Sequence, residues 1–471
     1  MRPKVILRHC ESYNPQRIQS IILEGMDLLG IRPHGRTLVK PNLVLPHPRY
    51  FPVNHTRAEF MDGLLGALRE RGEQISELSV GERCALSVPS RYAFYEAGYA
   101  RILRKHKARA VYFDERPSVP FALQHPDALH PTIFVPQALT RCDFFVNAPK
   151  FKAHSMMNVT FGMKNYIGLQ DDAYRLVDHT FTLAHKIADL QEILAPDFIA
   201  MDAILAGEYC EAAARPFPLH LIVMGANRVA ADAVCTYMVG LDPANVDHIR
   251  LASERGYGPI DLSEIELLGD VSLAEAKQRC ATFRLNLARV DQMLNGRGNI
   301  TVHLGSTPHR EFCPGGCPGF LKDAVLITEV FQPNVLQESR PLSYIIGDYQ
   351  GEIHSRPGEK IVALGDCARW SGQVDGKSLQ VEPKYQAHAV RAPSPARAKD
   401  WIQKSTEIRR NVNRQRSLPV VTIRGCPVPA LENTFILSIL GKTANPSLRW
   451  DITPRLIYFV LVSRLMRLLH R

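Results

Sequence analysis

The sequence predicts an α/β protein of two units, each with a largely parallel sheet covered by helices. Apolar runs of strand length alternate with stretches of helical spacing along most of the chain. At 471 residues the chain also exceeds the size at which one hydrophobic core keeps growing. The alternation restarts after a polar joint at 295–299. We therefore expect one α/β unit at 1–298, a second at 299–442, and a basic, apolar tail at 443–471.

The first unit opens with a strand, a helix and a strand. Residues 4–9 (KVILRH) form a short apolar run, and helical spacing follows from Asn14, which suits an N-cap, to Gly30, which suits a helix end. A second strand is expected at 37–42 (TLVKPN). Further strands are expected at 108–113, 143–149, 197–202 and 219–225, with helices at 182–194 and 229–240.

The second unit repeats this alternation. Its apolar runs are ITVHLG, LSYIIGD, KIVALGD and PVVTIRG, which predict strands at 300–305, 342–348, 360–366 and 419–425. Helical spacing predicts helices at 397–410 and 429–440. Strands separated by connections of this length indicate a second parallel sheet.

The charge of the chain limits the classes of partner. A formal net charge of +10 favours acidic small molecules, anionic lipid or nucleic acid. The sequence has no zinc-finger spacing, no RNA-recognition signature and no basic run interleaved with aromatic residues, so we expect no specific nucleic-acid binding. It also lacks a glycine-rich dinucleotide fingerprint and a Walker-type phosphate loop, so neither nicotinamide nor ATP is expected as an obligatory cofactor.

The two ends of the chain bear on its location. Residues 1–16 have only a short apolar run, neither a secretory signal nor a membrane span, so we expect a cytoplasmic protein. Residues 453–471 are apolar with interspersed arginines, and their uncharged run is shorter than the roughly twenty residues that cross a bilayer. This segment either packs on its own domain or lies on an anionic membrane or a partner; its arginines are Arg455, Arg464, Arg467 and Arg471.

Four of the ten cysteines follow predicted strands of the second unit. A reducing compartment makes a disulfide framework unexpected, so clustered cysteines indicate a metal or redox site. Loops that leave the carboxyl ends of parallel strands converge at one edge of the sheet. We therefore expect these thiols to meet and to hold a zinc ion or a [4Fe–4S] cluster. They are Cys313, Cys317, Cys367 and Cys426; the other six sit singly among mostly apolar residues and are read as small buried side chains.

The pattern CPGGC…GDCA…GCPVP resembles the proximal-cluster motif of nickel–iron hydrogenase small subunits and of the related complex I subunit. The departure is three residues, rather than two, inside the first pair. The resemblance implies one [4Fe–4S] cluster on these four cysteines. Zinc, or cysteines without a metal, remain the alternatives.

Five segments of the first 265 residues resemble, in order, the hallmark motifs of the family called domain of unknown function 362. Many members of that family carry ferredoxin-type clusters on closely repeated cysteines, whereas this chain has the dispersed carboxyl-terminal set. The segments are LVKPNLV (38–44), NAPKFKAH (147–154), FGMKNYIGL (161–169), DFIAMDAI (197–204) and NRVAADAVCTYMVGLDP (227–243).

These segments place cations and polar groups at strand ends, which predicts a cleft for a carboxylate, phosphate or enolate. Residues 150, 152 and 154 lie on one side of an extended strand, and 164–165 is expected in a loop. Solvated lysines and a locally bonded histidine are the structural alternative. The expected catalytic residues are Lys152, His154, Lys164 and Glu208, and the expected substrate-binding residues are Lys40, Asn42, Lys150 and Asn165.

Together these features favour an iron–sulfur oxidoreductase that exchanges electrons with an anionic small molecule. The alternatives are a non-redox metalloenzyme, of isomerase or lyase type, and an electron-transfer or scaffold protein that docks on a redox partner protein. His179 and His185 lie six residues apart, a poor fit to metal ligands on one helix face, and are expected to be structural.

Overall fold

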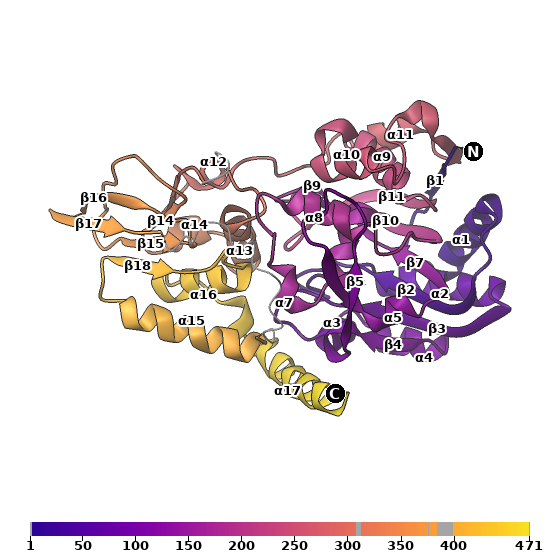
Figure 1. The fold of residues 1–471 in the computed structure, drawn as a ribbon, viewed down its shortest axis with the longest axis horizontal. Coiled ribbons are helices and arrows are strands. Elements are labelled where there is room, and N and C mark those ends of the chain that lie inside the picture. The colour runs from indigo at the N-terminus through magenta and orange to yellow at the C-terminus, as the bar shows by residue number, and fades with distance from the viewer. Residues whose placement is uncertain (1, 308–311, 375, 384–398, 471) are drawn as a thin grey trace. The chain divides into compact units, whose positions relative to one another are not determined.

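The computed structural model describes residues 2–307, 312–374, 376–383 and 399–470. Its helices and strands fall into two units (Figure 1). Unit 1 comprises Met1–Tyr174, Ala184–Asn286 and Leu461–Arg471, and unit 2 comprises Arg175–Leu183 and Leu287–Val460. Both units have the predicted α/β class, with sheets that are largely parallel and covered by helices.

A large mixed sheet forms the centre of unit 1. Strands β10, β7, β2, β3 and β4 are all parallel, whereas β11 runs antiparallel to both β10 and β1. Strand β8 pairs with β10 and with the short β9. In the described part of the chain the order is β12 (Glu266–Gly269), β1 (Lys4–His9), β11 (Arg215–Gly225), β10 (Phe198–Glu208), β7 (Phe144–Ala148), β2 (His34–Pro41), β3 (Gln74–Glu82) and β4 (Arg109–Tyr112), with β8 (Lys150–His154) and β9 (Asn158–Val159) beside it.

Helices cover both faces of this sheet. Alternate residues of β10 face opposite sides: Ala200 joins the core under α1 and α2, whereas Met201 contacts Cys235 of α9. The helices of unit 1 and its borders are α1 (Pro15–Leu29), α2 (Ala58–Arg71), α3 (Ser90–Glu96), α4 (Tyr99–Lys105), α5 (Gln137–Thr140), α6 (Phe161–Lys164), α7 (Asp172–Arg175), α8 (Leu183–Leu190), α9 (Arg228–Met238), α10 (Asp247–Glu254) and α11 (Leu273–Arg279). A hairpin of β5 (Ser118–Ala122) and β6 (Thr132–Pro136) lies outside the main sheet.

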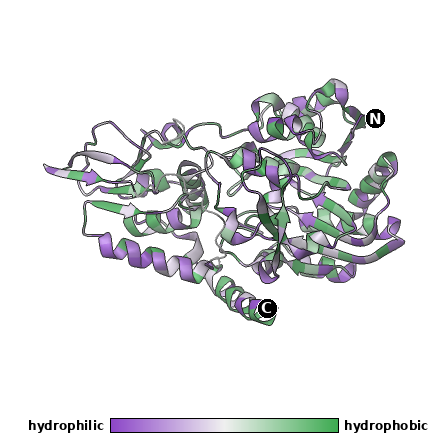
Figure 2. Cartoon of the chain, viewed as in Figure 1, coloured by the Kyte–Doolittle hydropathy of each residue, from purple (hydrophilic) through white to green (hydrophobic). Residues whose placement is uncertain are grey.

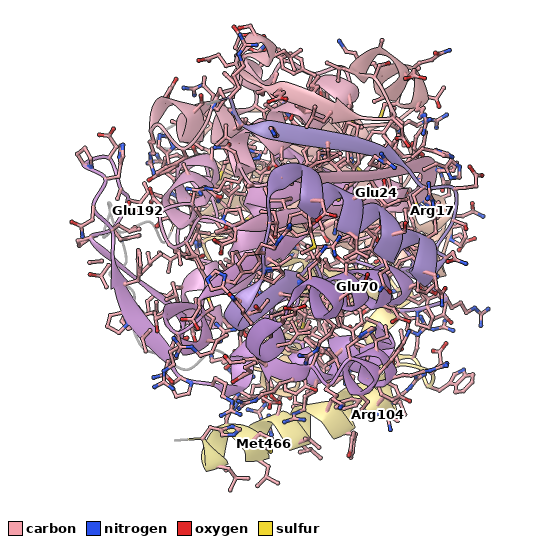
Figure 3. The ribbon with its side chains drawn as sticks, turned by 90° about the vertical axis from the view of Figure 1, so that its right-hand side faces the viewer. Arg17, Glu24, Glu70, Arg104, Glu192 and Met466 are labelled. Carbon is pink, nitrogen blue, oxygen red and sulfur yellow. The ribbon has the colours of Figure 1, made fainter. Side chains whose placement is uncertain are left out.

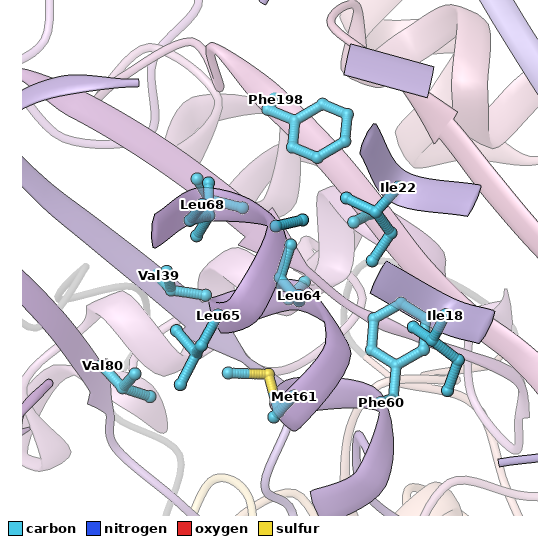
Figure 4. Packing of buried hydrophobic residues seen from close by; sticks show 14 of the residues in the cluster. Ile18, Ile22, Val39, Phe60, Met61, Leu64, Leu65, Leu68, Val80 and Phe198 are labelled. Atoms are coloured by element: carbon cyan, nitrogen blue, oxygen red, sulfur yellow. The ribbon is translucent and has the colours of Figure 1, made fainter. Parts of the chain in front are cut away.

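The ends of α1 follow the sequence signals. The Asn14 side chain accepts a hydrogen bond from the backbone N–H of Arg17, and Gly30 takes the left-handed conformation at φ +69°. The buried face of α1 packs on α2 and the sheet, and Ile18, Phe60 and Phe198 belong to the same buried cluster (Figure 4). On the outer side, Gln19 donates to Glu70 across the two helices (Figure 3 labels Glu70).

Unit 2 holds a four-stranded, all-parallel sheet in the order β13 (Ile300–Leu304), β14 (Leu342–Ile346), β15 (Lys360–Leu364) and β18 (Val420–Ile423). A hairpin of β16 (Trp370–Val374) and β17 (Lys377–Val381) follows β15. The helices are α12 (Val290–Leu294), α13 (Cys317–Phe331), α14 (Val335–Glu338), α15 (Trp401–Gln415) and α16 (Ala430–Leu440). Every strand expected in this unit is confirmed.

The chain ends in helix α17 (Thr453–Leu469), which begins in unit 2 and ends in unit 1. Much of this helix is hydrophobic (Figure 2). Within the described residues, no helix has both the length and the apolar character needed to cross a membrane. The last arginine of the expected basic face, Arg471, lies outside the described residues.

Candidate functional site

Three parallel strands of unit 2 position the four cysteines. Cys313 follows β13, and Cys317 is the first residue of α13, the helix that leaves that strand. Cys367 lies just after β15 and Cys426 just after β18. All four therefore leave the carboxyl ends of neighbouring or next-neighbouring strands, the edge at which open parallel sheets bind ligands.

The sulfur atoms of these cysteines lie near one another. A methyl group built on Gly365 would lie 3.0 Å from Cys317 Sγ and 3.9 Å from Cys367 Sγ, so these two sulfurs are within about 7 Å of each other. Electrostatic interactions join Cys313 to Cys367 and Cys426, and they join Cys317 to the other three cysteines. The structure thus brings together the four thiols that the strand-end argument selected.

Burial and mutual proximity favour the protonated thiols. Burial, followed by the charges of Cys426 and Cys367, raises the pKa of Cys313 to about 12. The same two causes, burial first, raise the pKa of Cys317 well above its usual value, although the backbone N–H of Val428 donates to its sulfur at 3.3 Å. Thiolates gathered in this way need a bound cation to compensate their charge.

Glycines allow the Cys313–Cys317 loop to fold closely against its neighbours. A methyl group on Gly316 would lie 2.7 Å from Cys313 Sγ, and one on Gly315 would lie 2.2 Å from the carbonyl oxygen of Thr180. Gly315 also accepts a 2.7 Å hydrogen bond from His179 Nδ1. His179 therefore has the structural role expected for it, and that role is to hold the cysteine loop.

Unit 1 contains the polar residues of the family-like motifs, and the first group surrounds Lys40. The Nζ of Lys40 is fully buried, lies 2.8 Å from a carboxylate oxygen of Glu82, and donates to Asn165 Oδ1 at 3.0 Å. Asn42 donates to the same Asn165 oxygen at 3.2 Å, and Asn165 donates to Asn147 at 2.8 Å. Lys40, Asn42 and Asn165 are thus brought together, and Glu82 neutralises the lysine.

A second group surrounds Lys150. Its Nζ lies 2.8 Å from a carboxylate oxygen of Asp202 and 2.9 Å from the hydroxyl of Tyr13, and both charged side chains are fully buried. Tyr13 donates to the other Asp202 oxygen at 2.8 Å. Burial lowers the pKa of Lys150, and the Asp202 charge opposes that shift. The strand register, which pairs Asp202 with Lys150, fixes this contact.

Lys152 is the buried lysine of this region that has no carboxylate within ion-pair distance among the described residues. Its Nζ donates to the carbonyl oxygens of Asn54, at 2.9 Å, and Glu211, at 3.4 Å. Burial above all lowers the pKa of Lys152 to about 7, with Lys164 as a further cause. This amine therefore titrates near neutral pH.

His154 lies beside the carboxylate of Glu211, which was not among the expected site residues. Its Nδ1 accepts from the backbone N–H of Met156 at 3.0 Å, so the proton of the neutral ring is on Nε2, which lies 3.1 Å from Glu211 Oε1. Glu208, the expected proton donor, instead accepts from the backbone N–H of Arg284 at 3.0 Å. Glu211, not Glu208, is the carboxylate beside His154.

A buried histidine adds to this region. His55 lies near Lys150, Arg57 and Lys152, and burial followed by these charges lowers its pKa to about 3. Its Nδ1 has no hydrogen-bond partner among the described residues. His55 follows no strand and belongs to no motif that the sequence analysis used, so only the fold reveals it.

The position of Lys164 differs from the expected loop. Lys164 ends α6, and Asn165 begins a turn of 3₁₀ helix over Asn165–Leu169. The carboxylates Glu82 and Asp202 both lie at or within strands of the sheet. Glu82 ends a strand in the same way as Lys40, so the strand-end rule could have found it.

Comparisons with known proteins agree with part of the sequence analysis. Residues 37–237 match the family model of a domain of unknown function, DUF362. Among solved structures, a lactate racemase apoprotein from Thermoanaerobacterium thermosaccharolyticum is similar at 10% sequence identity and a TM-score of 0.31, over 77% of this chain and 71% of that chain. The comparison with curated proteins found no significant match.

The matched region contains Lys40, Lys150, Lys152, His154 and Lys164. The four cysteines of unit 2 lie outside it. Residues 37–237 are thus similar to the DUF362 family, and a separate unit that gathers four cysteines follows them.

Proposed function

We propose that the protein is an iron–sulfur oxidoreductase that holds one [4Fe–4S] cluster in unit 2. The observation that carries this proposal is the approach of four thiols from the ends of three parallel strands. Cys313, Cys317, Cys367 and Cys426 would hold the group. When bound, a cluster of this kind supplies one-electron transfer at a potential set by charge, hydrogen bonds and exposure.

The pattern CPGGC…GDCA…GCPVP, which resembles a [4Fe–4S] motif, is the reason for preferring a cluster to a single zinc ion. Four thiolates around tetrahedral zinc lie 2.3 Å from the ion, which places the sulfurs about 3.8 Å apart. Within the described residues, no group of three or more His, Cys, Asp or Glu side chains has an arrangement suited to one metal ion. The upper limit of about 7 Å between Cys317 Sγ and Cys367 Sγ is compatible with either group, so metal analysis distinguishes the two.

The DUF362 domain would supply the site for an anionic small molecule. Glu82 and Asp202 already balance Lys40 and Lys150, whereas Lys152 has no carboxylate within ion-pair distance among the described residues. Lys152, with its pKa lowered to about 7, would exchange a proton with a bound substrate near neutral pH. Of the four predicted cations, Lys152 is therefore the preferred catalytic candidate.

Metal analysis and paramagnetic resonance on protein purified without oxygen test this proposal. We expect iron and acid-labile sulfide in equal amounts, and a signal that appears on reduction with dithionite and disappears on reoxidation. The Lys152→Met protein should keep the same iron content, because Lys152 belongs to unit 1 and the cysteines to unit 2. Zinc in place of iron, or a cluster that cannot be reduced, would overturn the redox proposal.

A further inference from the structure

Helix α17 presents an apolar stripe to solvent. Leu461, Leu465 and Leu468 recur at the spacing of one helix face and are 54%, 57% and 62% exposed. Tyr458 and Leu469 extend the same stripe and are also exposed. Single exposed leucines are ordinary on protein surfaces, whereas a continuous row along one helix marks a surface that contacts another molecule.

The opposite side of the helix is already occupied. Ser463 is buried, and its hydroxyl lies 3.4 Å from Asp114, a buried residue of unit 1. Arg467 lies 3.3 Å from the same carboxylate. These contacts fix the rotation of this part of the helix about its axis, so the leucine stripe faces outward in the folded protein.

The charges along this segment have one sign. Residues 452–471 contain no Asp or Glu but include four arginines. In helical projection, Arg464 borders the stripe on one side and Arg455 on the other. An exposed apolar stripe between arginines complements a surface that has anionic groups above an apolar layer. Figure 3 labels Met466 on this helix.

We propose that α17 binds in the plane of an anionic lipid bilayer, with the leucine stripe in the acyl boundary and the arginines at the lipid phosphates. A second copy of the chain fits the stripe less well. Each copy has a net charge of +10, and pairing the stripes would bring arginines of like charge together.

Sedimentation of the full-length protein with vesicles tests this proposal. Vesicles of phosphatidylglycerol and phosphatidylcholine should bind the protein, and vesicles of phosphatidylcholine alone should bind it far more weakly. The double variant Leu461→Gln/Leu465→Gln should lower the affinity about a hundredfold, because each leucine loses its apolar transfer energy. Arg464→Gln should lower it about fivefold.

A control variant and a second measurement show whether binding depends on the leucine stripe of α17. Leu28→Gln removes an exposed leucine of α1 and should leave vesicle binding unchanged. In a second measurement, the emission of a tryptophan introduced by Leu465→Trp should shift to the blue with anionic vesicles, whereas one introduced by Leu28→Trp should not. Equal binding of the wild-type protein and the double variant would overturn the proposal. The proposal would also be overturned if ultracentrifugation without vesicles showed a dimer of the wild-type protein and a monomer of Leu461→Gln/Leu465→Gln.

Discussion

The buried pair of Lys150 and Asp202 allows a quantitative prediction about unit 1. Both side chains are fully buried and their charged atoms lie 2.8 Å apart. In Lys150→Met the ammonium group is lost, and Asp202 keeps hydrogen bonds only from Tyr13 at 2.8 Å and from backbone N–H groups, among them Arg57 at 3.1 Å. The variant therefore leaves a buried carboxylate that has lost its ion-pair partner, with Arg57 as a remaining positive charge nearby.

The expected loss in the free energy of unfolding is about 3–5 kcal/mol, which is the usual result of removing one partner of a buried ion pair. Lys105→Met is the matched control. Lys105 also lies 2.7 Å from a carboxylate, that of Asp62, but its side chain is 52% exposed. An exposed pair contributes about 0–1 kcal/mol, so the two lysine variants should differ severalfold.

Urea unfolding followed by far-UV circular dichroism and by tryptophan fluorescence is the appropriate assay. The three tryptophans, Trp370, Trp401 and Trp450, all belong to unit 2, so a transition seen by circular dichroism alone reports unit 1. The double variant Lys150→Met/Asp202→Leu should recover much of the loss, since neither charge then remains. A Lys150→Met protein as stable as Lys105→Met would refute this account of the pair.

Three further predictions concern other buried groups. Burial lowers the pKa of His248 to about 3, and its ring nitrogens have no hydrogen-bond partner among the described residues, so the free energy of unfolding should fall as the pH drops from about 6.5 to 3. In urea titrations, His248→Leu should make this dependence on pH less steep. An unchanged dependence in the variant would count against a role of His248. The pKa of Lys152 is lowered to about 7 in the folded protein, so between pH 7 and about 10.5 this lysine binds a proton in the unfolded chain but not in the folded one, and the free energy of unfolding rises with pH. Lys152→Met should therefore stabilise the protein more at pH 7 than at pH 10. A larger stabilisation at pH 10 would contradict the lowered pKa. Gly315→Ala should lower the iron content of anaerobically purified protein, because the added methyl would lie 2.2 Å from a carbonyl oxygen; full iron content would show that the loop tolerates it.

Local patterns were sufficient to predict the four strands of the second sheet and several elements of the first, whereas helices such as α2 and α13 were not predicted. The caps of α1 and the apolar runs of the second sheet all appear in the structure. The direction of β11 was not predicted, because an antiparallel return and a parallel strand have the same apolar pattern. The segment 175–183 joins unit 2 although it lies within the first unit in sequence. Which unit a segment packs against depends on contacts between residues far apart in the sequence, and the local pattern of apolar residues carries no information about them.

The candidate site, like the fold, could be predicted only in part. The convergence of the four cysteines follows from where parallel strands end, a rule that needs only the order of elements. The partners of the lysines were not predicted: Glu82 is 42 residues from Lys40, and Asp202 is 52 residues from Lys150. Their pairing depends on strand order and register. Two lysines that were expected to face a ligand in a cleft are instead buried in ion pairs.

We propose that four cysteines of unit 2 hold one iron–sulfur cluster. Iron and sulfide content per chain in single serine variants tests it most directly, on protein purified without oxygen. The wild-type protein should contain about four irons and four sulfides. Serine at Cys313, Cys317, Cys367 or Cys426 should abolish or sharply reduce both, whereas Cys142→Ser, in unit 1, should leave both unchanged. Full iron content in any of the first four variants, or zinc in the wild-type protein, would contradict the claim.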